Sequence, residues 1–109
     1  MGMKRGGLVT VTVQGDYGKT RPALVIQSDY FDLHLSVTIL PLTSALKGAP
    51  LFRITVDPRK ENGLTRPTQV IIDKALTVLR EKIGPVIGRL GDDEMIAVTR
   101  SLALFLGFA

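Results

Sequence analysis

One segment near the C-terminus, residues 92–107, has the apolar spacing of an α-helix, whereas the chain before it does not. Apolar side chains recur there at helical intervals, at Met95, Val98, Leu102 and Phe105 or Leu106. Three acidic residues come first, where the positive end of a helix dipole favours carboxylates, and Gly107 follows as a natural stop. A chain whose single helix lies at its end must build its core mainly from strands.

The preceding segments are short apolar runs separated by Gly, Pro and charged residues, as in a series of short strands. Residues 8–13 alternate apolar and small polar side chains, whereas residues 22–27 form a continuous apolar run, which predicts burial on both faces of a sheet. Pro22 suits the first position of that strand, where no backbone donor is missed. Further strands are predicted at 36–42, 52–56, 68–73, 77–80 and 86–90, with a helical turn within 29–34 and a loop at 57–67. The expected fold is mainly β (α+β): a small, curled, mostly antiparallel sheet capped by the C-terminal helix.

Length and composition restrict the class of protein. The 109 residues fit one domain, 1–109, in which Met1-Gly2-Met3 is expected to be disordered or an added extension. The chain has no cysteine, which excludes disulfides, thiolate zinc sites and cysteine nucleophiles. No apolar run approaches the roughly 20 residues that span a bilayer, and the N-terminus is too polar for a signal peptide. We therefore expect a cytoplasmic protein with no membrane association.

Basic residues outnumber acidic ones, and the excess is concentrated before the helix. Residues 1–89 carry 13 basic and 7 acidic side chains, a net charge of +6. Such an excess favours polyanionic partners, because binding releases their condensed counterions. Charge alone leaves open whether that partner is a nucleic acid.

The side chains that could carry out chemistry are few. The single histidine, His34, excludes two-histidine ribonuclease chemistry and histidine metal clusters, and it is expected to be a surface or structural residue. The sequence contains neither a P-loop nor a dinucleotide-binding fingerprint. Arginine, lysine, hydroxyl and carboxylate groups remain. An arginine fork matches phosphate oxygens, and RNA cleavage by its own 2′-hydroxyl needs charge stabilisation and proton transfer but no metal. This set of groups suits a phosphodiester, and no cofactor is expected.

Six motifs follow one another along the chain: Lys4-Arg5-Gly6, Arg21-Pro22-Ala23-Leu24-Val25-Ile26, Leu40-Pro41-Leu42-Thr43-Ser44, Asn62-Gly63-Leu64, Gln69-Val70 through Asp73-Lys74, and Lys82-Ile83-Gly84 up to Gly88-Arg89-Leu90. In this order and spacing they resemble the MazF/PemK toxins of toxin–antitoxin systems. The resemblance implies a curled sheet like an SH3-like barrel, assembled as a homodimer. It also implies a sequence-specific, metal-independent endoribonuclease that cuts single-stranded mRNA to 2′,3′-cyclic phosphate and 5′-OH ends. An acidic antitoxin would occupy its RNA groove.

The same resemblance implies the site residues. Arg21 matches the arginine that stabilises the scissile phosphate, and Pro22 restricts its backbone so that the cation points in a fixed direction. Thr43 matches a catalytic or phosphate-contacting threonine. Asp16 and Asp73 match acidic positions that relatives use in catalysis or RNA binding. The expected RNA-binding residues are Lys19, Thr20, Ser44, Gln69 and Lys74, and no metal ligands are expected.

Taken without the resemblance, these residues also have ordinary structural explanations. Arg21 reads as a surface arginine that opens a strand, and Thr43 and Ser44 read as turn residues that leave one. Asp73 reads as a strand-end carboxylate paired with Lys74. Asp16 reads as a common loop aspartate. Which carboxylate takes part in proton transfer stays open between the two.

Two positions depart from the family pattern, and two other functions compete with the nuclease. Gly7 stands where relatives commonly have Asp, and Leu76 stands where they commonly have Arg. The missing arginine would remove one phosphate or base contact. A gyrase poison of the CcdB type is one alternative, but those relatives end in Trp-Gly-Ile and this chain contains no tryptophan. A catalytically silent RNA-binding relative is the other. Single-strand binders usually present aromatic stacking platforms, and the phenylalanines here are expected to be largely structural.

Overall fold

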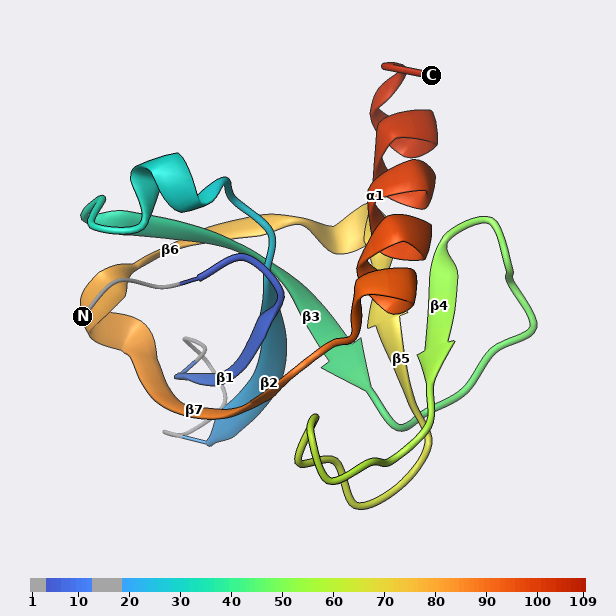
Figure 1. Cartoon of the computed structure of the whole chain (residues 1–109), viewed down its shortest axis with the longest axis horizontal. Helices are drawn as coiled ribbons and strands as arrows, with labels where there is room; N and C mark the ends of the chain where they lie inside the picture. Colours follow the sequence, from blue (N-terminus) through green and yellow to red (C-terminus); the bar gives the residue numbers. More distant parts are fainter. Residues whose placement is uncertain (1–3, 13–18) are drawn as a thin grey trace.

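The computed structural model describes residues 4–12 and 19–109. Within them the chain forms short strands, three 3₁₀ turns and one α-helix (Figure 1). The strands are β1 (Gly7–Thr12), β2 (Thr20–Val25), β3 (Ser36–Thr43), β4 (Arg53–Val56), β5 (Thr68–Ile71), β6 (Leu76–Leu79) and β7 (Ile83–Arg89). The turns are η1 (Asp29–Phe31), η2 (Ile72–Lys74) and η3 (Arg80–Lys82), and the helix is α1 (Asp92–Leu106). The expected mainly β domain with one C-terminal helix is confirmed.

The strands form one curled antiparallel sheet with the order β4-β5-β3-β2-β1-β7. Strand β3 is central because one of its edges pairs with β2, while the other pairs with β6 in its first half and with β5 in its second. Figure 1 shows the resulting curl, with β6 beside β3 and β7 beside β1. Within the described residues the end strands β4 and β7 do not pair, so the curled sheet is open and is not a closed barrel.

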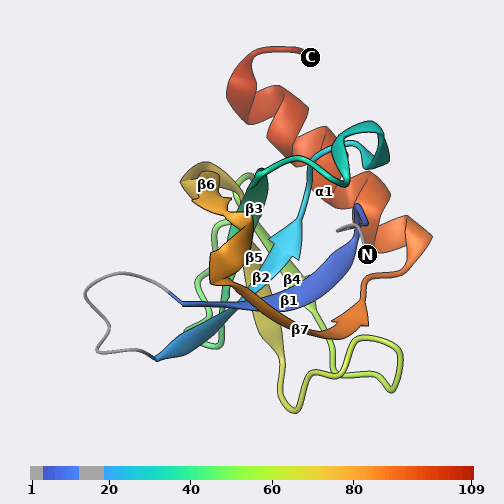
Figure 2. The ribbon, with the colours of Figure 1, turned by 90° about the vertical axis from the view of Figure 1, so that its left-hand side faces the viewer.

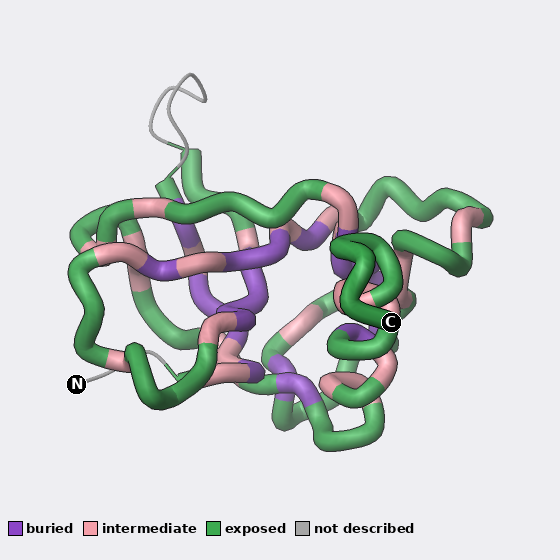
Figure 3. Tube along the Cα trace, turned by 90° about the horizontal axis from the view of Figure 1, so that it is seen from above, coloured by how far each residue is buried: buried purple, intermediate pink, exposed green. Residues whose placement is uncertain are grey.

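The sheet has a core on each face, as the apolar run at residues 22–27 predicted. Leu24 pairs with Leu8 and Leu40 and lies in the larger core, which faces α1. The alternate positions Ala23 and Val25 lie in a second core inside the curl. All five of these side chains are fully buried, and Figure 3 shows the buried positions gathered along the central strands. The strand that leads into the candidate site is therefore held from both sides.

Several element boundaries differ from the prediction by two or three residues. The strand expected at 68–73 ends at Ile71, because the chain turns there into η2. The last strand starts at Ile83 instead of residue 86, since Pro85 is tolerated on β7, which lies at an edge of the sheet. The other strands and the turn at η1 lie where the patterns placed them, within two residues.

Helix α1 begins and ends at the predicted signals. The Glu94 carboxylate accepts a hydrogen bond from the backbone N–H of Gly91 (2.9 Å), and it also pairs with the Arg59 guanidinium at 2.6 Å. Gly107 ends the helix in the left-handed conformation, with φ +84°, which glycine adopts without steric cost. Val98 is buried in the larger core, but Phe105 and Leu106 are about half exposed. The predicted stripe is thus only partly buried, because the last turns extend beyond the sheet (Figures 1 and 2). In this helix we find no stretch long and apolar enough to cross a membrane.

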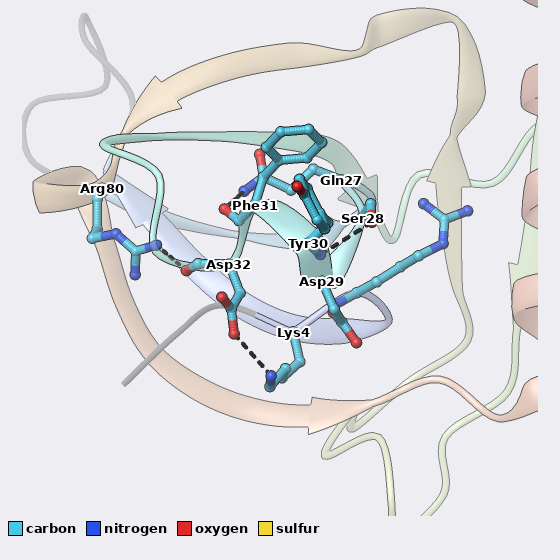
Figure 4. Close-up of polar contacts among 9 residues, drawn as sticks. Lys4, Gln27, Ser28, Asp29, Tyr30, Phe31, Asp32 and Arg80 are labelled. Carbon is cyan, nitrogen blue, oxygen red and sulfur yellow. Dashed lines mark hydrogen bonds and ion pairs between the residues drawn. The ribbon is translucent and has the colours of Figure 1, made fainter.

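Turn η1 is fixed by polar contacts from both sides (Figure 4). The Lys4 ammonium donates a hydrogen bond to the Asp32 carboxylate (2.8 Å), and the Arg5 backbone N–H donates one to the Asp29 carboxylate (2.6 Å). From the other side, the Arg80 guanidinium donates to the carbonyl oxygens of His34 (2.9 Å) and Asp32. The turn consequently holds its apolar side chains outward: Tyr30 is 87% exposed.

We expect Asp32→Asn to remove a small, pH-dependent contribution to stability. The hydrogen bond from Lys4 and its positive charge hold the pKa of the Asp32 carboxyl below its usual value of 3.8. A carboxyl with a lowered pKa stabilises the fold above its unfolded-state pKa and loses that effect as the pH falls through the folded-state value. Unfolding midpoints should therefore fall more steeply from about pH 5 to about pH 3 in the wild type than in Asp32→Asn. Glu81→Gln, at an exposed carboxylate, is the control, and identical pH profiles for wild type and Asp32→Asn would contradict the assignment.

Candidate active site

A pocket of about 370 Å³ lies where the start of β2, the end of β3, the loop 57–67 and β7 meet. Its wall consists of Thr10, Thr20, Arg21, Pro22, Leu42, Thr43, Ser44, Gly63, Leu64, Thr65, Arg66, Thr68 and Ile87. Two arginines and a series of hydroxyl groups thus share one pocket with the apolar side chains of Pro22, Leu42, Leu64 and Ile87. Of the predicted residues, the pocket brings together Arg21, Thr43, Thr20 and Ser44.

Arg21 stands on the exposed end of a strand whose next residues are buried. It lies opposite Val11 of β1, and Pro22 lies opposite Thr10. The side chain of Arg21 is exposed, whereas Ala23 is 1% exposed and packed in the inner core. The strand starts two residues before Pro22, so Arg21 has a strand backbone as well as the restriction that the following proline imposes.

Thr43 is the last residue of β3, and its hydroxyl is already oriented. Its Oγ1 accepts a hydrogen bond from the backbone N–H of Ala45 (3.0 Å), which is the side-chain turn expected of a threonine that leaves a strand. A hydroxyl has one donor and two acceptor sites, so this bond leaves the O–H available for donation. The structural explanation and a functional role of Thr43 are therefore compatible. Ser44 follows it in an exposed position.

The loop 57–67 forms the opposite wall and is held by its own backbone and by Asn62. The Asn62 side chain, 1% exposed, accepts hydrogen bonds from the backbone N–H groups of Arg59 and Leu64 (both 3.0 Å) and donates one to the Asp57 carbonyl (2.9 Å). The loop also packs directly on β7. A Cβ atom at Gly88 would lie 2.4 Å from the carbonyl carbon of Asn62.

This loop brings in two site residues that the sequence reasoning missed, Thr65 and Arg66. Both side chains are exposed, and within the part of the chain that the structure describes neither makes a hydrogen bond or ion pair. The sequence did not single them out, because residues 57–67 have the composition of an ordinary charged loop. The Asn62-Gly63 pair was the available clue, since Gly63 has φ +68° and marks a tight turn.

The remaining predicted residues lie elsewhere. Lys19 is exposed and directly precedes Thr20 in the pocket wall. Asp73 and Lys74 lie in η2, beyond the far end of β5, and do not line the pocket. Gln69 is 5% exposed, and its amide is bound to Lys47 and Thr55. Asp16 lies outside the described residues.

The two departures from the family pattern are also outside the pocket wall. Leu76 begins β6, lies opposite Ile39 and is 43% exposed. Gly7 begins β1, and its backbone N–H bonds to the Lys4 carbonyl oxygen (3.0 Å). A Cβ atom at Gly7 would lie 3.1 Å from that same oxygen, so the glycine fits a tight turn. Neither departure from the family pattern therefore removes a side chain from the wall of this pocket.

The pocket is suited to an anion. Two guanidinium groups, Arg21 and Arg66, offer planar forks to phosphate oxygens, and the Thr43 hydroxyl is a neutral donor beside them. No described wall residue carries a carboxylate. Elsewhere in residues 4–12 and 19–109, we find no group of three His, Asp or Glu side chains that could hold a metal ion. The site can therefore concentrate positive charge on one phosphodiester.

Comparison with known proteins agrees with this arrangement. Residues 4–106 match the family described as PemK-like, MazF-like toxins of type II toxin–antitoxin systems. A protein of Mycolicibacterium smegmatis named "Probable endoribonuclease MazF" is 42% identical over 108 residues, which cover 98% of this chain and 99% of that protein. These matches favour the MazF-like reading over the CcdB-type alternative.

Solved structures share the fold at low sequence identity. The chain aligns with an endoribonuclease in complex with its cognate antitoxin from a mycobacterial species at a TM-score of 0.83, with 21% identity over 98% of this chain and 97% of the other. It aligns with the Mycobacterium tuberculosis toxin MazF-mt6 at a TM-score of 0.79, with 24% identity over 93% and 96% of the two chains. Since the family match spans nearly the whole chain, this protein belongs to the PemK-like and MazF-like toxins of type II toxin–antitoxin systems.

Proposed function

We propose that this chain is a sequence-specific endoribonuclease toxin that cuts single-stranded mRNA without a metal and thereby stops translation. The observation that carries the proposal is the meeting of Arg21, Arg66 and the Thr43 hydroxyl in one pocket of a MazF-like fold. The M. smegmatis relative, named as a probable endoribonuclease, supports the activity. Because mRNA is its substrate, we place the protein in the cytoplasm.

In the proposed reaction the 2′-hydroxyl oxygen of the RNA attacks the adjacent phosphorus atom. The P–O5′ bond breaks, which leaves a 2′,3′-cyclic phosphate and a 5′-hydroxyl, so the proton lost from the 2′-oxygen is matched by one gained at the 5′-oxygen. Arg21 and Arg66 neutralise the charge that develops on the non-bridging oxygens, and Thr43 donates its O–H to one of them. Donors placed before the reaction stabilise the transition state without reorganisation at that moment.

Proton transfer is assigned to a carboxylate, and we favour Asp16 over Asp73. Asp73 lies in η2 and does not line the pocket, whereas Asp16 precedes Arg21 by five residues in the sequence. Lys19, Thr20 and Ser44, in or beside the pocket wall, would bind the flanking nucleotides, and Lys74 would contact more distant phosphates. Comparing Asp16→Asn with Asp73→Asn in a cleavage assay tests this choice, which a greater loss in Asp73→Asn would reverse.

The central test is incubation of the purified protein with a long single-stranded RNA in EDTA, followed by mapping of the new ends. We expect discrete cuts at one recurring short sequence, each with a 5′-hydroxyl on the downstream fragment. Those cuts would establish a metal-independent nuclease and identify its recognition sequence. Binding of the RNA without cleavage would favour the catalytically silent relative instead.

Thr43→Val is expected to lower kcat by about 10- to 100-fold, because the variant lacks the donor proposed to bind the phosphate. Thr43→Ser keeps the hydroxyl and should retain most of the activity. Single-turnover cleavage of an RNA that contains the mapped sequence measures the difference. Equal rates for the valine and serine variants would show that the hydroxyl has no role in the reaction.

We propose that the toxin has two kinds of protein partner, an acidic antitoxin and a second copy of itself. Solved MazF-like proteins in complex with an antitoxin support the first, and the basic pocket suits an acidic segment. For the homodimer we propose the apolar surface of Tyr30, Phe31, Leu33, Leu35 and Leu79, all of which are exposed in the single chain. The expectation that the phenylalanines are largely structural is wrong, since all four are exposed in the single chain: Phe31 to 52%, Phe52 to 39%, Phe105 to 54% and Phe108 to 82%.

Sedimentation velocity at micromolar concentration tests the dimer. Leu35→Glu should shift the protein towards monomer, because it places a charge in the proposed interface, where Leu35 is 79% exposed in the single chain. Leu51→Glu, at another exposed leucine (69%), is the matched control. A monomeric wild type, or equal behaviour of both variants, would remove this surface as the interface.

A further inference from the structure

Gln69 lies beside the pocket but is covered by the segment 45–47. It belongs to β5 and stands directly opposite Thr43 of β3 in the antiparallel register. Its side chain is only 5% exposed, although it is polar, and a buried amide must find its hydrogen bonds within the protein. The position of Gln69 beside Thr43 makes those bonds relevant to the site.

The amide of Gln69 clamps the backbone of Lys47. Its Oε1 accepts a hydrogen bond from the Lys47 N–H (2.9 Å), and its Nε2 donates one to the Lys47 carbonyl oxygen (2.9 Å). The second donor position of Nε2 is used by the Thr55 hydroxyl (3.1 Å), and the second acceptor position of Oε1 by the Arg53 guanidinium (3.3 Å). All four hydrogen-bonding positions of the amide are thus occupied by the protein, with none left for RNA.

These partners allow only one orientation of the amide. A backbone N–H and a guanidinium can only donate, so both must face Oε1, while the Lys47 carbonyl can only accept and must face Nε2. Rotation of the amide by 180° would oppose donor to donor at Lys47. Gln69 therefore satisfies all of these partners, whereas an acidic or apolar side chain of the same length could not.

The clamp continues to the Thr43 hydroxyl. The guanidinium of Arg53, which contacts Gln69 Oε1, also donates to the Ala45 carbonyl oxygen at 3.4 Å. The N–H of the same residue, Ala45, is the group that binds Thr43 Oγ1. Gln69 and Arg53 together bind the segment 45–47 that follows Thr43, and that segment supplies the N–H that occupies one lone pair of the hydroxyl.

We propose that Gln69 is a positioning residue of this site, which acts on the reaction through Ala45 and the Thr43 hydroxyl and not by touching RNA. The proposal rests on the proposed nuclease function and replaces the expectation that Gln69 binds RNA directly. Loss of the clamp releases the segment 45–47, so that the Thr43 hydroxyl is no longer held in its productive direction. Displacement of a catalytic group by about 1 Å can cost up to about 100-fold in rate.

Gln69→Met tests the proposal, since methionine has a similar length and makes none of the four bonds. We expect kcat to fall about 10- to 100-fold, while binding of an RNA with a 2′-deoxy nucleotide at the cut site changes less than about twofold. Thr55→Val removes one partner of the amide but leaves the Lys47 clamp, and it should keep activity near the wild type. Loss of RNA binding in Gln69→Met with kcat intact would overturn the proposal.

A double-mutant cycle with Thr43→Val separates positioning from a general structural effect. If Gln69 acts through the Thr43 hydroxyl, Gln69→Met should cost nothing further in kcat once that hydroxyl is gone. If the loss of kcat in the double variant equals the product of the losses in the two single variants, Gln69 acts by another route. Arg53→Met is the second variant, should Gln69→Met fail to fold, and it should show the same lack of additivity.

Amide hydrogen exchange supplies a readout that does not depend on activity. The N–H groups of Ala45 and Lys47 should exchange faster in Gln69→Met than in the wild type, whereas the N–H of Asn62, in the loop on β7, should not change. If the wild type cuts no RNA, the proposed function fails, and faster exchange still supports the clamp. Unchanged exchange at both amides would overturn the positioning role in either case.

Discussion

Arg21→Ala should lower the rate of RNA cleavage by about 100- to 1,000-fold while the protein remains folded. The guanidinium is proposed to neutralise charge that appears on the phosphate only in the transition state, so its removal should act on kcat more than on RNA binding. The fold should not suffer, because the side chain is exposed while the residues that anchor the strand, Ala23 and Leu24, are buried.

Two further arginine variants make the result specific. Arg21→Lys keeps the charge but not the planar fork, so its rate should lie between those of the wild type and Arg21→Ala. Arg100→Ala removes an exposed arginine from α1, outside the pocket, and should cut RNA normally. Single-turnover cleavage and thermal unfolding of all four proteins give the comparison. Cleavage by Arg21→Ala at the wild-type rate would refute the assignment of Arg21.

Gly88→Ala should destabilise the protein by about 3 kcal/mol or more, because the new methyl group would clash with backbone atoms of the loop 57–67. It would lie 2.4 Å and 2.5 Å from the carbonyl carbon and oxygen of Asn62 and 2.6 Å from the carbonyl oxygen of Glu61. All three are backbone atoms, so the loop 57–67 must separate from β7. This also breaks the hydrogen bond from the Arg89 N–H to the Glu61 carbonyl oxygen (2.9 Å).

Gly48→Ala is the matched control, since no atom lies within 4 Å of a Cβ placed there. It should be neutral or stabilise the fold by up to about 1 kcal/mol, through the lower entropy of the unfolded chain. Chemical denaturation of both variants measures the contrast. Where Gly88→Ala still folds, its cleavage rate should also fall, because Arg66 is displaced with the loop. Equal stability of the two variants would mean that the loop is not packed on β7 as described.

The sequence predicted the half of the site that depends on local pattern. Arg21 follows from the junction of a charged loop with an apolar strand and from the proline after it, and Thr43 follows from the end of β3. Both belong to strands whose burial pattern can be read along the chain. Their meeting in one pocket is a property of the sheet order, for which the family resemblance was needed.

The other half of the site depends on contacts between distant segments. Arg66 reaches the pocket because Asn62 ties the loop to itself and because Gly88 allows backbone to touch backbone, and neither contact has a periodic signal. Gln69 was expected to bind RNA because it lies in a family motif. Its burial follows only from the folding of the segment 45–47 over β5.

The main-chain packing of the loop 57–67 on β7 also bears on how this toxin can change its target during evolution. Since carbonyl groups, glycines and the Asn62 amide hold the loop, the side chains of Thr65 and Arg66 have no bonding task within the described fold. Arg66 is constrained by its proposed role at the phosphate, but substitutions at Thr65 can accumulate at little cost in stability. A lineage of such toxins would be able to exchange one RNA motif for another there, while the backbone that presents the motif-reading side chains stays the same.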